Sequence, residues 1–135
     1  MNRLEVLRQS LPSYAKDLKL NLQSVLKDGS LTEEQRLGVD LAAATSARYE
    51  PLREALNDLL DSPEVTEDAA AAAALMAMNN VYYRFRHFME GAYDQKPARL
   101  RMTRLAQVKS TKANFELFSL AVSAINGCEL CVRAH

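Results

Sequence analysis

The chain has 135 residues, with seventeen basic and seventeen acidic side chains, so its formal net charge is zero. This length suits one compact domain, and the balanced charge without a basic stripe argues against nucleic acid as a partner. The N-terminus lacks the uninterrupted apolar core of a signal peptide, and no apolar run approaches the length of a membrane span. We therefore expect a cytoplasmic protein without membrane association, where closely spaced cysteines favour catalysis over a structural disulfide.

Glycine and proline are sparse, four of each, and helix-forming residues dominate, so we expect an all-α fold. The first predicted helix follows Pro12-Ser13, runs to Lys27 and ends at Gly29. The capping box Thr32 to Gln35 opens a second helix that reaches about Arg48. Pro51 suits the first turn of a third helix, whose predicted buried face consists of Leu52, Leu56, Leu59 and Leu60.

A long helix is predicted next, capped by Thr66-Glu67-Asp68 and running through an alanine run to about Gly91. The alanines favour the close approach of another helix. Asn79-Asn80 and 84–87 could line a site, but the favoured interpretation is that the asparagines are buried and bridge helices, that 84–87 form a solvated basic face, and that His87 is structural. After a polar loop, a short helix is predicted from Ala98 to Gln107.

The segment from Lys112 to His135 contains both cysteines of the chain, Cys128 and Cys131, in a C-x-x-C pattern. Apolar residues at helical spacing run from Ala113 to Ile125 and stop at Asn126-Gly127, a pair suited to a helix C-terminus. A second helix beginning near Cys128 would fold back on the first. In this hairpin Cys131 lies level with Val122, and His135 lies level with Phe118, within reach of Glu116.

These residue types together indicate redox chemistry. The thiolate is the reactive form of cysteine, and an ordinary thiol is mostly protonated at neutral pH. His135 as proton acceptor, supported by Glu116, and the dipole of the helix that begins at the motif both favour the thiolate. The other cysteine, one turn away, can condense with a sulfenic acid. Peroxide reduction or dithiol exchange is the predicted chemistry.

Other interpretations of the two cysteines remain open. They could be inert core residues of a helical protein. A zinc site would find three ligands in the C-x-x-C pair and a histidine, but no second Cys/His pair follows. Haem attachment needs a histidine directly after the second cysteine, where Val132 stands. A thioredoxin fold would place the motif after a strand, and no strand is predicted.

A faint internal repeat appears when the sequence is shifted so that 41–46 lie on 120–125. On that register Tyr49, Leu52, Leu56 and Leu37 stand where Cys128, Cys131, His135 and Glu116 stand in the second copy. Chance similarity between alanine-rich helices is the alternative. The repeat predicts one domain, 1–135, with half-repeats at about 31–96 and 110–135. The second is incomplete, lacking a counterpart of about thirty residues.

Four segments carry a family resemblance: SLPSYAKDLKLNLQSVL (10–26), MNNVYYR (78–84), EGAYD (90–94) and KANFELFSLAVSAINGCELC with the following VRAH (112–135). Together they resemble the alkyl hydroperoxidase AhpD family, within the carboxymuconolactone decarboxylase-like superfamily. The resemblance implies an all-helical fold of two related halves, assembled as a homotrimer. It also implies further helices after His135, so the chain is expected to lack C-terminal helices.

The resemblance further implies an antioxidant enzyme that reduces organic hydroperoxides through its C-x-x-C pair and passes electrons to an AhpC-type peroxiredoxin. By position, Cys131 would attack the peroxide, Cys128 would resolve the sulfenic acid, and His135 with Glu116 would deprotonate Cys131. One difference is that Leu130 stands where the family pattern has a histidine. The water-binding or proton-transfer role of that histidine is then absent or filled otherwise.

The implied reductant is a lipoyl group on a 2-oxoacid dehydrogenase component, recharged by lipoamide dehydrogenase and NADH, with no cofactor bound to the chain itself. The alternative function is a dithiol adaptor or redox-sensing interaction protein that accepts electrons but reacts poorly with peroxide. A decarboxylase interpretation within the superfamily is weaker, because it leaves the cysteines without a role.

Overall fold

The structure, a computed structural model, describes residues 1–27 and 29–135. In this part of the chain all regular structure is helical, which confirms the predicted all-α fold. The α-helices are α1 (Arg3–Ser10), α2 (Lys16–Val25), α3 (Glu33–Ser46), α4 (Glu50–Asn57), α5 (Pro63–Phe88), α6 (Lys112–Ile125) and α7 (Glu129–Ala134). Two short 3-10 turns, η1 (Ser13–Ala15) and η2 (Thr103–Ala106), join them. Helix α1 was not among the predicted elements.

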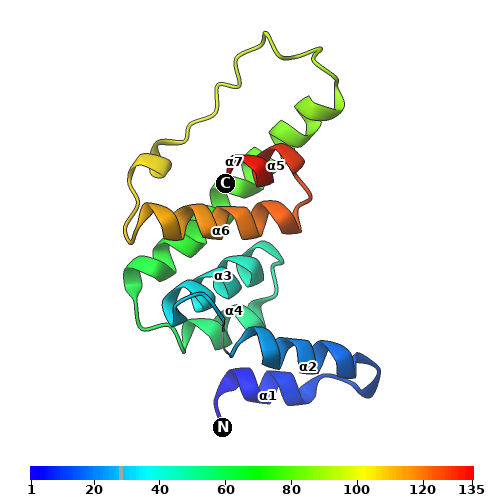
Figure 1. Ribbon diagram of the computed structural model, residues 1–135, viewed down its shortest axis with the longest axis vertical. Helices are drawn as coiled ribbons and strands as arrows, with labels where there is room; N and C mark the ends of the chain where they lie inside the picture. Colours follow the sequence, from blue (N-terminus) through cyan, green and yellow to red (C-terminus); the bar gives the residue numbers. More distant parts are fainter. Residues whose placement is uncertain (28) are drawn as a thin grey trace.

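The long helix α5 runs through the molecule, and α3 and α6 pack against it and against each other (Figure 1). The pair α1 and α2 lies at the N-terminal end, where α1 contacts α4. The long connection from α5 to α6 loops away from the helices, and α7 lies beside α5 near the C-terminus (Figure 1). Residues far apart in the sequence therefore meet along α5.

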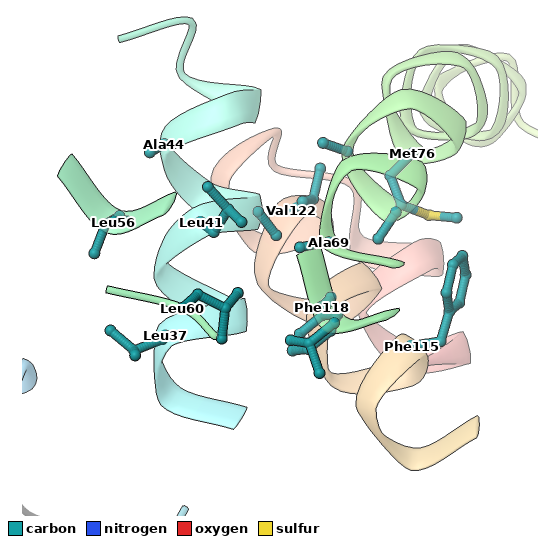
Figure 2. Packing of buried hydrophobic residues seen from close by; sticks show 14 of the residues in the cluster. Leu37, Leu41, Ala44, Leu56, Leu60, Ala69, Met76, Phe115, Phe118 and Val122 are labelled. Carbon is teal, nitrogen blue, oxygen red and sulfur yellow. The ribbon is translucent and has the colours of Figure 1, made fainter. Parts of the chain in front are cut away.

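The hydrophobic core lies where α3, α5 and α6 meet. Figure 2 shows Leu41 of α3, Ala69 and Met76 of α5, and Phe118 and Val122 of α6 converging there. The alanine run contributes buried residues to this cluster, as the prediction of close helix approach required. The closest approach is at Gly38 of α3, where an added Cβ would lie 2.3 Å from Cζ of Phe118.

Local signals in the sequence set several helix ends. Thr32 and Gln35 form the predicted capping box at the start of α3. Pro51 occupies the first turn of α4, where its missing N–H leaves no bond unmade. Gly127, after the end of α6, has φ +66, a left-handed conformation that glycine adopts without a steric penalty.

Three expectations were wrong in detail. The long helix begins at Pro63 rather than near Thr66, because Ser62 caps it and proline suits its first position. Only the 3-10 turn η2 forms within the predicted helix from Ala98 to Gln107. Leu59 of the predicted leucine face is 36% exposed, whereas Leu56 is 1% exposed.

The carboxylate of Asp68, fully buried on α5, fixes the segment that leads into α6. It accepts hydrogen bonds from the backbone N–H groups of Lys109 (3.0 Å) and Ser110 (2.7 Å), from Oγ of Ser110 (2.7 Å) and from Nη2 of Arg104 (2.8 Å). Burial by itself raises the pKa of Asp68, but these hydrogen bonds, led by those of Ser110, bring it below its ordinary value. Asp68 is therefore held as a paired carboxylate.

The hairpins α3–α4 and α6–α7 share one register. Gln35 Nε2 of the first donates to Asn114 Oδ1 of the second at 3.2 Å, and these residues are 79 positions apart. The same separation relates the start of α3 to that of α6, their ends, and the starts of α4 and α7. It also relates Arg48 and Gly127, both with positive φ. The two hairpins are thus alike in structure, while the division into half-repeats at about 31–96 and 110–135 stays a prediction.

No helix in the described part of the chain is both long enough and apolar enough to cross a membrane.

We predict that Gly38→Ala destabilises the fold by about 1–3 kcal/mol, because the new methyl group overlaps Phe118 and Val65 in a packed core. Denaturant unfolding measures the change. Gly29→Ala is the control, since no atom lies within 4 Å of an added Cβ there. Equal stability of the Gly38 variant and the parent would contradict the close packing of α3 on α6.

We predict that Asp68→Asn lowers stability at pH 7 by about 3 kcal/mol, because it breaks a buried charge pair with Arg104. Since the pKa of Asp68 is lowered on folding, the unfolded chain takes up the proton first as the pH falls. The contribution of the Asp68 carboxylate to the free energy of unfolding is therefore complete above the ordinary carboxyl pKa. It is lost as the pH falls through the lowered pKa. Unfolding curves of parent and variant should converge in acid.

The control for this prediction is Asp94→Asn, which removes an exposed carboxylate paired with Arg86. Its effect at pH 7 should stay below about 1 kcal/mol. If the difference in the free energy of unfolding between the parent and Asp68→Asn stays constant down to strongly acidic pH, the carboxylate charge of Asp68 does not stabilise the fold.

Candidate active site

The turn between α6 and α7 presents the C-x-x-C motif. Asn126 caps the end of α6, Gly127 reverses the chain, and Cys128 is the N-cap of α7. The backbone N–H of Cys128 donates to the carbonyl of Ser123 (3.1 Å), and Sγ of Cys128 accepts from the backbone N–H of Cys131 (3.3 Å). The predicted hairpin, with its second helix starting at the motif, is confirmed in this geometry.

The two cysteines form a disulfide, with their Cα atoms 5.3 Å apart. Cys128 is completely buried, and Cys131 is 4% exposed. The two cysteines are therefore paired, as redox chemistry at a C-x-x-C motif requires. Cys131 is the more exposed of the two residues. The interpretation of the cysteines as two separate inert core residues does not fit this pairing.

Glu116 and His135 meet across the hairpin, as helix arithmetic predicted. Oε2 of Glu116 lies 2.6 Å from Nδ1 of His135, within hydrogen-bond distance. The His135 side chain is 14% exposed, and that of Glu116 is 38% exposed. A carboxylate at Nδ1 fixes the orientation of the ring and leaves Nε2 free to exchange a proton. His135 stands four positions after Cys131.

Helix α5 supplies the opposite wall of the site. A pocket of about 140 Å³ opens beside Cys131 and is lined by Asn79, Tyr83, Leu130, Cys131, Ala134 and His135. The sulfur of Cys131 lies 3.9 Å from the backbone carbonyl oxygen of Asn79. Leu130 and Ala134 are the apolar side chains of this lining, and Asn79, Tyr83, Cys131 and His135 carry its polar or ionisable groups. Leu130, where the family pattern has a histidine, is part of this lining.

A buried amide network holds the turn against α5. Nδ2 of Asn80 donates to Oγ of Ser123 (3.0 Å), and Oδ1 of Asn80 accepts from Nδ2 of Asn126 (3.0 Å). Nη1 of Arg84, one turn further along α5, donates to the carbonyl of Asn126 at 3.2 Å. Asn80 therefore bridges α5 and α6, as predicted, and fixes the position of the motif.

The sequence prediction missed two residues of the pocket, Asn79 and Tyr83. For Asn79, a bridge between helices was favoured over a place in a site, and Tyr83 was not singled out. These two residues lie one helix turn apart on α5, and α5 reaches the motif only through the tertiary fold. The local signal was the pair of asparagines that follows the alanine- and methionine-rich part of the helix.

Four hollows of larger volume in the described part of the chain are lined by neither cysteine. One of about 430 Å³ lies between α3 and α5 and includes Arg48 and Arg84 but neither cysteine. Within the described residues, no group of three or more His, Cys, Asp or Glu side chains is placed to hold a metal ion. The pocket at Cys131 is therefore the candidate active site.

The arrangement supports two-electron thiol chemistry. A reduced pair would offer one thiol at the pocket and a second within bonding distance of it. The adjacent imidazole can accept the thiol proton, and the carboxylate bonded to that imidazole stabilises the charge that results. Each element of this chemistry comes from the α6–α7 hairpin, and α5 closes the pocket.

Comparison with known proteins agrees with this geometry. No family model matches the chain. An alkyl hydroperoxide reductase AhpD of Anaeromyxobacter sp. (strain K) is 56% identical over 141 residues, covering 100% of this chain and 75% of that protein. Proteins of the same name from Rhizorhabdus wittichii and Gluconacetobacter diazotrophicus are 48% and 47% identical, each covering 98% of this chain and respectively 79% and 75% of their own length. The chain therefore belongs to the alkyl hydroperoxide reductase AhpD family.

Proposed function

We propose that the protein is an antioxidant enzyme that reduces alkyl hydroperoxides with its Cys128–Cys131 pair. The observation that carries the proposal is the meeting of three features at one pocket: the disulfide, the hydrogen bond of 2.6 Å between Glu116 and His135, and an apolar lining beside Cys131. The names of the relatives support the same activity, since each is called an alkyl hydroperoxide reductase.

Cys131 is the thiol that attacks the peroxide in this proposal. It lines the pocket together with His135, whereas Cys128 is completely buried and is not part of the lining. His135 takes the proton of the Cys131 thiol, and Glu116 stabilises the charge that results. Cys128 resolves the product.

The reaction consumes one hydroperoxide for each disulfide formed. The Cys131 thiolate attacks the terminal oxygen of ROOH, the O–O bond breaks, and the leaving alkoxide takes a proton to become the alcohol. Cys131 is then a sulfenic acid. The Cys128 thiol attacks its sulfur, water leaves, and the disulfide of the present structure results.

The disulfide must be reduced before the next cycle. We propose a lipoyl group of a 2-oxoacid dehydrogenase component as the reductant: its dithiol gives two electrons and two protons and becomes the lipoyl disulfide, which lipoamide dehydrogenase recharges from NADH. Such a donor implies a cytoplasmic site of action and requires no cofactor on this chain. Transfer of electrons to an AhpC-type peroxiredoxin and assembly as a homotrimer belong to the same proposal.

A dithiol adaptor or redox-sensing protein is the rival function. The observation in its favour is burial: with both sulfurs almost inaccessible, the pair can be stable as a disulfide and react slowly with peroxide. The two functions differ in whether Cys131 reacts rapidly with a hydroperoxide when no partner protein is present.

We predict that Cys131→Ser abolishes peroxide-dependent NADH oxidation in the presence of lipoamide and lipoamide dehydrogenase. Cys128→Ser should trap one sulfenic acid on Cys131, because the resolving thiol is gone. Dimedone labelling followed by peptide mass spectrometry locates it.

Two results would contradict this assignment. A trapped sulfenic acid on Cys128 in the Cys131→Ser variant, with none on Cys131 in the Cys128→Ser variant, would reverse the roles of the two thiols. No turnover by the parent, with its disulfide still reduced by dihydrolipoamide, would favour the adaptor instead.

We predict that Glu116→Gln raises the apparent pKa of the Cys131 thiol. The variant removes the charge that stabilises the proton taken up by His135. Thiolate absorbance of the reduced Cys128→Ser protein as a function of pH measures the change. Glu129→Gln is the matched control, since Glu129 is an exposed carboxylate of α7 that pairs with Arg133. A shift of equal size in both variants would remove Glu116 from the proton-transfer path.

A further inference from the structure

Two neighbouring asparagines of α5 are buried but differ in their hydrogen bonds. Asn80 uses both ends of its amide within the protein, donating to Ser123 and accepting from Asn126. Asn79 is 6% exposed; its Nδ2 donates to the thioether sulfur of Met102 at 3.1 Å, and its Oδ1 has no hydrogen-bond partner among the described residues. A thioether is a weak acceptor, and a buried amide oxygen without a partner is costly. The side-chain amide of Asn79 therefore makes weaker and fewer hydrogen bonds within the protein than that of Asn80.

The position of Asn79 at the pocket beside Cys131 suggests a role for its unpaired amide oxygen. Asn79 lines the 140 Å³ pocket together with Cys131 and His135, and its backbone carbonyl lies 3.9 Å from Sγ of Cys131. The other buried side-chain atoms without partners, on Arg36, Asp40 and Ser119, belong to residues outside this lining. Among the described residues, Asn79 is thus the one that combines a buried, unpaired amide oxygen with a place in the lining of the pocket beside Cys131.

A hydroperoxide carries a complementary group. Its terminal oxygen, the one that a thiolate attacks, bears a proton that must be hydrogen-bonded when the molecule leaves water. An acceptor on the wall of the pocket satisfies that proton and turns the terminal oxygen toward the sulfur. Among the remaining lining residues, Leu130 and Ala134 offer an apolar surface for the alkyl group, and Tyr83 adds an aromatic ring with a hydroxyl group.

We propose that Oδ1 of Asn79 accepts a hydrogen bond from the terminal O–H of an organic hydroperoxide and orients it for attack by Cys131. The inference rests on the proposed peroxidase function. The thiolate forms an S–O bond to the terminal oxygen as the O–O bond breaks. The proton held by Asn79 stays on the oxygen that becomes the sulfenic acid, and the departing alkoxide takes its proton from the His135 side of the pocket.

The experiment compares two reactions of the same thiol. In reduced Cys128→Ser protein, Cys131 is oxidised by cumene hydroperoxide and, separately, alkylated by iodoacetamide, which has no peroxide O–H. Asn79→Leu replaces the amide by an apolar group of similar size. We expect it to slow oxidation about tenfold, the effect of one hydrogen bond of about 1.4 kcal/mol, and to leave the rate of alkylation and the thiol pKa unchanged.

Asn80→Ala is the matched control, because it removes a neighbouring buried amide whose bonds all lie within the protein. It should lower the melting temperature and leave the ratio of the two rates as in the parent. Asn79→Ala provides a smaller substitution if Asn79→Leu does not fold, with the same expected loss in oxidation alone.

The outcomes separate this inference from the function on which it rests. Rapid oxidation of both the parent and the Asn79 variants would leave the peroxidase proposal standing and overturn the role of Asn79. Equal slowing of oxidation and alkylation would also overturn it, since Asn79 would then act only on the structure or the thiol. Failure of the parent to react with the hydroperoxide would overturn the proposed function and this inference together.

Discussion

The buried carboxylate of Asp68 determines where the α6–α7 hairpin lies. Its bonds to Arg104, Lys109 and Ser110 hold the end of the long connection against α5, so that α6 starts at a fixed point on that helix. From this point α6 runs across the core, with Phe118 against Gly38 of α3. The active-site pocket, which needs α5 and α7 side by side, depends on this placement.

The sequence predicted the hairpin well because its signals are local. Asn126-Gly127 marks the turn, and helix spacing alone brings Glu116 opposite His135. Asp68 and Asn79 could not be assigned in this way. Their partners lie 36 to 42 positions away for Asp68 and 23 positions away for Asn79, and no periodic pattern links such positions. Within the helix predicted from Ala98 to Gln107 only η2 forms, and the side chain of its Arg104 bonds to Asp68, 36 positions away.

The shared register of the two hairpins shows how a site can be built on a core scaffold. In the first hairpin, Leu37 and Leu56 stand where Glu116 and His135 stand in the second, and both leucines belong to the hydrophobic core. Equivalent positions therefore carry buried leucines in the first hairpin and the hydrogen-bonded pair of Glu116 and His135 in the second. Since the backbones of the two hairpins are alike, the packing of the helices sets the geometry of this pair.

The pocket combines groups from two parts of the chain with separate tasks. The hairpin supplies the two cysteines, His135 and Glu116, all close in sequence and fixed by the turn. Helix α5 supplies the opposing wall, and its position depends on the packing of the whole core. Burial lowers the local dielectric, so each hydrogen bond to a reacting group is stronger than in water. The packing that strengthens these hydrogen bonds also limits access to the pocket, and Leu130, which is 40% exposed, is a lining residue that the pocket shares with two neighbouring surface hollows.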